Sequence, residues 1–229
     1  MKHKTSEILL RLTTEIDAFT SDDLHKIAED EVVAAYHGDI FLAEGVDASA
    51  IIEGERYEYT YIGSLTACLI EYNKLGNLPK TQGESAEEVL ADYGVDKQTA
   101  KLMAKTSGRN PFRQSDHPAS TTEKLLYVQS IHLLADYRHK DLGKLSLEAC
   151  IQRLGDKHTT VILPILPHQF DKEPDLAESW MFFTNDAQSA IKTLSKHFES
   201  LAFKSMKMPA VAEGEMPVHV LFRPAVIGD

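Results

Sequence analysis

The sequence has few of the residues that mark disulfide-rich, metal-binding or membrane proteins. Its 229 residues include two cysteines and one tryptophan, and no apolar run approaches the roughly 18 residues that span a membrane. Cys68 and Cys150 both lie in apolar surroundings, so we expect reduced, buried thiols. Neither has a metal ligand at a useful spacing, so we predict no metal site. Charged residues interrupt the N-terminal stretch, which excludes a signal peptide and favours a cytoplasmic protein without membrane contact.

The sequence also has fewer positively charged residues than negatively charged ones. Lysine and arginine number 24 against 35 aspartates and glutamates, giving a formal net charge of -11. Nucleic-acid binding draws its affinity from clustered lysine and arginine, so we expect no nucleic-acid partner. An acidic balance is compatible with a basic substrate such as an amine. With 43% hydrophobic residues, the composition is that of a globular protein, and the length fits a single domain over residues 1–229.

The hydrophobic pattern divides the chain into three parts. In residues 1–38 we predict N-terminal helices, because apolar residues recur at three- and four-residue steps from Ile8 to Phe19 and again from Leu24 to Ala35. Residues 79–122 are predicted to be an insertion of short helices and a polar loop. The predicted helices of this insertion are Ser85–Tyr93 and Asp96–Lys105. Between the two parts we expect strands at Asp39–Ala43, Arg56–Ile62 and Ser64–Tyr72, with Gly63 separating the last two.

Residues 124–207 follow a strand–turn–helix–strand pattern. Strands alternating with helices favour an α/β or α+β sheet domain over a helical bundle. The elements expected from residue 124 onward are a strand at Leu125–Leu134, a helix at Leu145–Leu154, a buried strand at Thr159–Leu166, a helix from Asp186 to about Leu201, and strands at Ala202–Lys207 and Val218–Phe222.

The turn between the first strand and helix of this part suits a diphosphate. It runs from Tyr137 to Lys144 and is mostly basic in an otherwise acidic chain. The first amides of a helix have no acceptor within the helix, and the helix dipole adds partial positive charge there. Several donors therefore converge on an anion. Gly143 has no Cβ where the backbone would approach such a ligand.

These residues resemble motif A of the GNAT superfamily of acyl-CoA N-acyltransferases. That motif is Arg/Gln-x-x-Gly-x-Gly/Ala after an apolar strand, with Arg138 at the first position and Gly143 at the last. The stretch SKHFESLAFKSM, Ser195 to Met206, resembles motif B, and Tyr59 to Tyr72 can supply two preceding strands. The resemblance covers roughly residues 124–207. It departs from the family pattern at Asp141, which replaces the first motif-A glycine, and at Phe198 and Ala202 in motif B.

The resemblance implies a mixed, mostly antiparallel sheet that is splayed in the middle and flanked by helices. It implies acetyl-CoA or coenzyme A as cosubstrate and a small-molecule or peptide amine as acceptor. Its candidate catalytic residues are His132, a possible general base, and Tyr127, at the place where one branch of the family has a glutamate. The cofactor-binding residues that it implies are Ile131, His132, Leu133, Arg138, His139, Lys140, Asp141, Leu142, Gly143 and Lys144.

Two functions that use acyl-CoA are compatible with the sequence, and a purely structural α/β domain that binds no CoA is a third possibility. The first is an acyl-CoA-dependent N-acyltransferase with an unidentified amine acceptor. The second is a catalytically weak or inactive domain that binds acyl-CoA or a protein, because Asp141 places a carboxylate at the diphosphate and Phe198 cannot donate a proton where the family often has a tyrosine. Tyr57, Tyr59 and Tyr61 alternate on one strand and form either a packing face or part of an acceptor cleft. The oligomeric state stays open and includes a homodimer.

Overall fold

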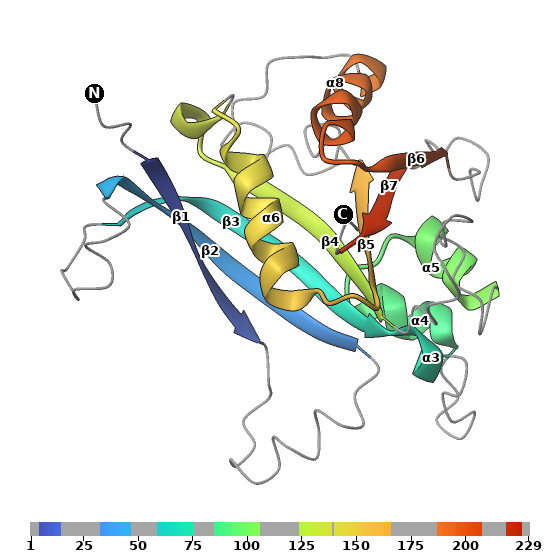
Figure 1. Ribbon diagram of the computed structural model, residues 1–229. Coiled ribbons are helices and arrows are strands. Elements are labelled where there is room, and N and C mark those ends of the chain that lie inside the picture. The colour runs from blue at the N-terminus through green and yellow to red at the C-terminus, as the bar shows by residue number, and fades with distance from the viewer. Residues whose placement is uncertain are drawn as a thin grey trace, which may run out of the picture.

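The structure is a computed structural model that describes residues 5–14, 33–46, 59–75, 85–105, 124–138, 140–165, 187–207 and 219–225. These residues build one seven-stranded sheet in the order β1-β2-β3-β4-β5-β7-β6 (Figure 1). Every neighbouring pair is antiparallel except β4 and β5, which are parallel. The predicted α+β class with a mixed, mostly antiparallel sheet is therefore confirmed. The strands are β1 (Thr5–Thr14), β2 (Val33–Val46), β3 (Thr60–Glu71), β4 (Lys124–Leu133), β5 (Thr159–Ile165), β6 (Lys204–Lys207) and β7 (His219–Pro224).

The N-terminal prediction was wrong where the structure describes it. Residues 5–14 form the edge strand β1 and not a helix. Ile8 and Leu10 pack against the core while Leu9 between them is 43% exposed, which is the two-residue alternation of a strand. Of the second predicted helix, Val33 to Ala35 belong to β2, and its earlier residues lie outside the described ones.

Gly63 was predicted to separate two strands, but it lies within the single strand β3. A Cβ at Gly63 would come within 2.0 Å of the His132 carbonyl oxygen on β4. The glycine is therefore needed for the close approach of two backbones, and it does not end regular structure.

Helices cover both faces of the sheet, and the two faces carry separate hydrophobic clusters. One cluster lies under α6 (Leu142–Leu154) and α8 (Ala187–Glu199) and includes Leu126 and Val128 of β4. The other lies under α3 (Tyr72–Leu75), α4 (Ala86–Asp92) and α5 (Lys97–Lys105) and includes Leu125 and Tyr127 (Figure 1). Side chains on β4 thus alternate between the two helical layers, as expected for a strand buried on both faces.

The predicted helices and strands of the second half are close to the observed ones. The helix expected at Leu145–Leu154 begins three residues earlier, at Leu142, and the insertion helices α4 and α5 start after their predicted caps, Ser85 and Asp96. Both cysteines are buried, and burial raises the pKa of each thiol to about 12. Of the described helices, none is both long and apolar enough to cross a membrane.

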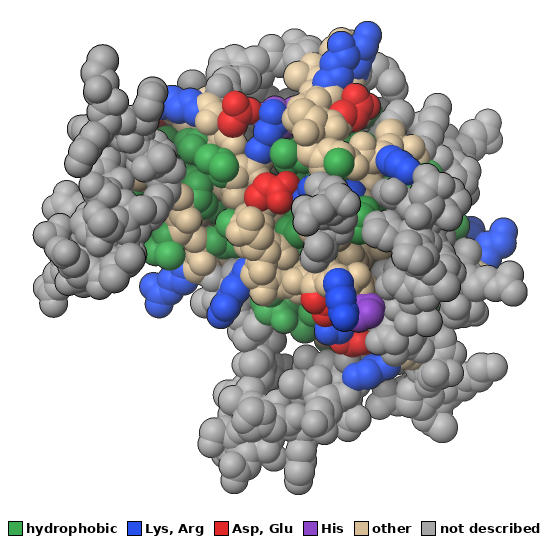
Figure 2. All heavy atoms as spheres, viewed as in Figure 1, with side chains coloured by type: hydrophobic (Ala, Val, Ile, Leu, Met, Phe, Trp, Pro, Cys, Tyr) green, Lys and Arg blue, Asp and Glu red, His purple; other side chains and the backbone are tan. Residues whose placement is uncertain are grey.

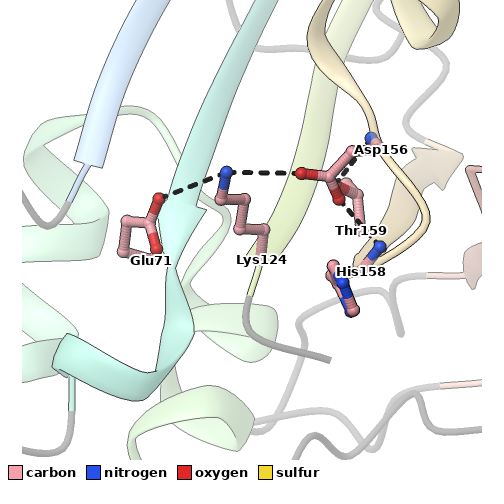
Figure 3. Close-up of polar contacts among 5 residues, drawn as sticks. All are labelled: Glu71, Lys124, Asp156, His158 and Thr159. Atoms are coloured by element: carbon pink, nitrogen blue, oxygen red, sulfur yellow. Dashed lines mark hydrogen bonds and ion pairs between the residues drawn. The ribbon is translucent and has the colours of Figure 1, made fainter. Parts of the chain in front are cut away.

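A polar network joins β3, β4 and β5 where β4 and β5 begin (Figure 3). The Lys124 Nζ lies 3.8 Å from Glu71 Oε1 and 3.3 Å from Asp156 Oδ2. Asp156 in turn accepts hydrogen bonds from the His158 amide and the Thr159 hydroxyl, each at 2.8 Å. Both strands are therefore fixed at this end by their backbones and by a bridging lysine.

Candidate functional site: the opening between β4 and β5

The two parallel strands are hydrogen-bonded to each other along only part of their length. Pairing runs from Lys124 with Thr159 to Tyr127 with Ile162 and then stops, although β4 continues to Leu133 and β5 to Ile165. Beyond that point β4 stays paired with β3, and β5 stays paired with β7. The strands consequently diverge (Figure 1), and the splay that the sequence predicted is present.

The register decides which backbone groups face this opening. The Leu134 amide donates to the Ile62 carbonyl on β3 at 2.9 Å, and the His132 carbonyl lies against Gly63 on the same side. In a strand, successive residues direct their peptide groups to opposite edges. Ile131 and Leu133 therefore present their amides and carbonyls to the opening. His132 was predicted to bind the cofactor together with Ile131 and Leu133, but its backbone instead pairs with β3.

Helix α6 begins close to the end of β4, and its first amides are not capped within the described structure. The first intrahelical bond runs from the Leu145 amide to the Asp141 carbonyl at 3.1 Å, so the amides of Leu142, Gly143 and Lys144 precede any helical acceptor. Asp141 occupies the N-cap position, but its side chain makes no capping hydrogen bond. It lies in the left-handed region, with φ 57° and ψ 7°, where glycine is the least strained residue.

Three basic side chains surround these amides in different ways. Arg138 donates from Nε to the Leu133 carbonyl at 2.9 Å, and partial burial lowers the pKa of its guanidinium, which still keeps its charge. The Lys144 ammonium lies 3.2 Å from the Asp141 carboxylate. Lys140 is exposed, with Nζ 5.4 Å from the centre of the Tyr137 ring. Predicted residue His139 lies outside the described residues.

The residues at the start of α6 fit a diphosphate. Beyond its chain neighbours and the helix backbone, the one described atom that a Cβ at Gly143 would meet is Leu133 Cδ1, at 3.7 Å, so the described residues leave space beside the open amides. Asp141 is neutralised by Lys144, which answers the repulsion expected from a carboxylate in the turn. Acidic and basic side chains are interspersed among the described residues on the face that α6 covers (Figure 2). The basic side chains of the turn are therefore not part of a larger basic patch among the described residues on this face.

The two candidate catalytic side chains occupy different environments. His132 is half-buried near the end of β4. Tyr127 is fully buried, and its hydroxyl donates to Asp96 Oδ2 at 2.9 Å and accepts from the Asp96 amide at 3.1 Å. Burial, reinforced by the Asp96 carboxylate, raises the pKa of Tyr127 well above its ordinary value. Tyr127 thus has no route to a reacting group, whereas His132 lies on the part of β4 beyond its pairing with β5.

The motif-B residues lie at the end of α8. Phe198 is 8% exposed and packs edge-on against Phe203, with ring centres 6.5 Å apart. Ala202 has a φ of 62°, again a conformation that favours glycine. Sequence reasoning missed Arg223, which is 2% exposed and binds the Leu201 carbonyl at 3.0 Å and Glu148 of α6 at 2.6 Å. An isolated arginine in a C-terminal strand gave no signal for this link between β7, α6 and the end of α8.

The described residues contain no group of three or more histidine, cysteine, aspartate or glutamate side chains that could hold a metal ion. The strand order, the parallel pair that diverges, and the helix that begins beside that divergence are the splayed, mostly antiparallel arrangement that the resemblance to the GNAT superfamily implied.

Among solved structures, the chain is similar to two crystal structures of NAA60 from Arabidopsis thaliana, one with a bisubstrate analogue and one with acetyl-CoA. The alignments cover 95% of this chain and 97% and 98% of the other, at 9% identity and TM-scores of 0.39 and 0.40. A likeness this distant does not extend to activity or substrate. No protein-family model and no curated protein matches the sequence.

Proposed function

We propose that this chain binds acyl-CoA in the opening between β4 and β5 and transfers the acyl group to an amine. The observation that carries the proposal is the end of β4–β5 pairing at Tyr127 and Ile162, beside a helix whose first amides are open. The amides of Leu142, Gly143 and Lys144 would hold the diphosphate, with Arg138 supplying charge. The amides of Ile131 and Leu133 and the Ile131 carbonyl would pair with the pantetheine arm in place of a neighbouring strand, while the Leu133 carbonyl binds Arg138.

In the proposed reaction, the amine nitrogen attacks the thioester carbonyl carbon. A C–N bond forms, the C–S bond breaks, and the proton lost by the amine goes to a base while the thiolate leaves and takes up a proton. His132 is the proposed base, because imidazole exchanges protons near neutral pH and this side chain lies on the strand that lines the opening. Tyr127 is left out of this role because its hydroxyl is buried and bonded to Asp96.

The acceptor is proposed to approach from the sheet face opposite α6. On this face the cross-strand neighbours Phe41 and Tyr61 make an edge-to-face contact, with ring centres 5.9 Å apart. Tyr61 and Tyr59 are 42% and 41% exposed, so the surface can take an apolar substituent of the amine. The third tyrosine of the predicted row, Tyr57, lies outside the described residues.

The second candidate function is acyl-CoA binding without turnover. It is favoured by the burial of Phe198, because a phenyl ring packed in the core stands where the family resemblance implies that a tyrosine often donates a proton. Incubation with acetyl-CoA and a panel of amines, with measurement of free thiol, distinguishes the two. Thiol release that depends on one class of amine supports transfer. Tight CoA binding with no release from any amine supports the second function.

Binding itself is tested by reversing charge at the turn. Arg138→Glu should weaken CoA binding at least about tenfold, because it places a carboxylate beside the diphosphate. Arg153→Glu is the matched control, since it makes the same charge change on the exposed last turn of α6. Calorimetry should find its dissociation constant close to that of the unmodified protein. Equal affinities for all three proteins would remove the diphosphate assignment.

A steric variant tests the same place without changing charge. Gly143→Trp should block CoA, because a ring would fill the space beside the open amides. Retained affinity would show that these amides are not the cradle.

A further inference from the structure

The hairpin formed by α4 and α5 touches β4 at an irregular point of that strand. Thr66 of β3 pairs with Ser130, and the next residue, Ala67, pairs with Val128, so Gln129 is an extra residue in β4. Such a β-bulge shifts the strand by one residue. The turn between α4 and α5 lies against it: a Cβ at Gly94 would come within 2.5 Å of the Gln129 side-chain nitrogen. Gly94 also has a φ of 74°, so the turn requires glycine for its conformation as well.

A second contact fixes the same hairpin two residues before the bulge. The buried Tyr127 hydroxyl donates to Asp96 Oδ2 and accepts from the Asp96 amide. The other oxygen of Asp96 caps α5 by accepting from the Thr99 amide at 2.9 Å. One carboxylate therefore joins the start of α5 to β4. The raised pKa of Tyr127 means that this hydroxyl keeps its proton and its donor role across the physiological pH range.

The bulge determines which residues face the opening. Before it, Leu126 and Val128 face the cluster under α6; after it, Ile131 and Leu133 pack there. If the same residues formed a regular strand without the bulge, the alternation would continue unshifted and would bring Ser130 and His132 to that face. The peptide groups would exchange edges in the same way, and those of Ile131 and Leu133 would turn toward β3. The acyl-CoA opening would then lose both of its proposed pairing residues.

We propose that the α4–α5 hairpin is a positioning element: through Gly94 and Asp96 it holds the bulge at Gln129 and so directs Ile131 and Leu133 into the acyl-CoA opening. The expected effect on acyl-CoA binding rests on the proposed function. The role of the hairpin in holding the bulge does not. Tyr127 is accordingly a positioning residue and not a catalytic one. The insertion of residues 79–122 then contributes to the site through Gly94 and Asp96.

Tyr72 offers a matched control for Tyr127. Both are buried tyrosines whose hydroxyls bind α5 or its cap, but Tyr72 donates to the Met103 carbonyl at 3.1 Å, near the other end of α5. Tyr127→Phe removes two hydrogen bonds of a buried phenol, both with Asp96, and Tyr72→Phe removes the one to the Met103 carbonyl. Both variants should lower the melting temperature, and only Tyr127→Phe should loosen the residues on both sides of the bulge.

The experiment compares the two variants and Gly94→Ala by hydrogen exchange without ligand and by CoA calorimetry. Tyr127→Phe and Gly94→Ala should speed exchange of the amides in residues 128–133 and weaken CoA binding about tenfold, and Tyr72→Phe should change neither. Equal exchange and equal affinity in Tyr127→Phe and Tyr72→Phe would overturn the inference, and this comparison stands if Gly94→Ala fails to fold. If the unmodified protein binds no CoA, the proposed function fails, while the exchange of residues 128–133 still decides whether the hairpin holds the bulge.

Discussion

The two ends of the β4–β5 pair differ in how their polar groups are satisfied. At the closed end, backbone pairing from Lys124 to Tyr127 is continuous, and the Lys124 ammonium joins carboxylates of β3 and of the turn before β5 (Figure 3). At the open end, β4 keeps its pairing with β3, and no strand among the described residues pairs with its other edge. Arg138 binds one carbonyl there, and α6 begins with open amides.

From this difference we infer which features of the pair stabilise the fold and which belong to the proposed binding site. Backbone groups without a partner are costly to bury, and a sheet usually satisfies them with a neighbouring strand. The closed end follows that rule and adds side-chain links. The open end departs from it in residues that adjoin a helix N-terminus, and such a departure is expected where a ligand supplies the missing partner. Substitutions at the two ends should therefore affect different measurements.

The largest expected effect comes from two identical substitutions of glycine. Gly63→Ala places a Cβ within 2.0 Å of a β4 backbone oxygen, so the strands must separate, and we expect a loss of about 3 kcal/mol in the free energy of unfolding. Among the described residues, the Cβ of Gly143→Ala meets one side-chain carbon at 3.7 Å, and this variant should change the same quantity by less than about 1 kcal/mol. Urea denaturation measures both. Similar losses would mean that Gly143 is held by packing and that its missing Cβ is not reserved for a ligand.

A smaller effect is expected at the closed end and depends on pH. Burial alone would raise the pKa of Asp156, but hydrogen bonds from His158 and Thr159 and the nearby Lys124 outweigh it and lower this pKa. A carboxyl with a lowered pKa in the folded state stabilises the protein above its unfolded pKa, near 3.8, and loses that contribution as the pH falls through its folded pKa.

Asp156→Asn should therefore cost about 1 kcal/mol at pH 6, a modest value because this side chain is 45% exposed. The deficit should shrink once the pH falls below about 4. Urea midpoints recorded from pH 7 to pH 3 test this. A deficit that stays constant over that range would show that the charge of Asp156 contributes nothing, and that any loss comes from altered hydrogen bonding.

The sequence was most informative where local pattern and tertiary role agree. The strand, turn and helix from Lys124 to Leu154 combine apolar runs with a basic turn, and the structure has these elements in that order. The helix predicted at residues 5–14 was wrong because Ile8, Leu9 and Leu12 fit helical spacing. In the structure these residues form a strand, in which Ile8 and Leu10 face the core. An edge strand with one exposed leucine resembles an amphipathic helix when only apolar spacing is considered.

The site was less predictable because it depends on contacts between segments far apart in the sequence. The bulge at Gln129 is visible only in the register between β3 and β4, and the buried bond between Tyr127 and Asp96 joins residues 31 positions apart. The family resemblance identified Tyr127 by its place in a motif and could not show that its hydroxyl is already bound. The left-handed conformation of Asp141 is likewise set by how the chain enters α6 after β4.

Asp141 gives the smallest and most selective prediction. Its left-handed φ costs a non-glycine residue about 1 kcal/mol, while its exposed ion pair with Lys144 contributes less. Asp141→Gly should therefore raise the free energy of unfolding slightly, by about 0.5 kcal/mol. It should also tighten CoA binding about fivefold at low salt, because Lys144 then faces the diphosphate without a competing carboxylate.

Asp141→Asn separates these two effects, because it removes the charge while keeping a side chain at the same backbone angle. It should reproduce the gain in affinity with little of the gain in stability, and added salt should reduce the gain in both variants. An affinity that is unchanged in both variants at low salt would mean that the diphosphate does not approach this turn. The open amides of α6 would then need another explanation than ligand binding, even though the splay of β4 and β5 itself would stand.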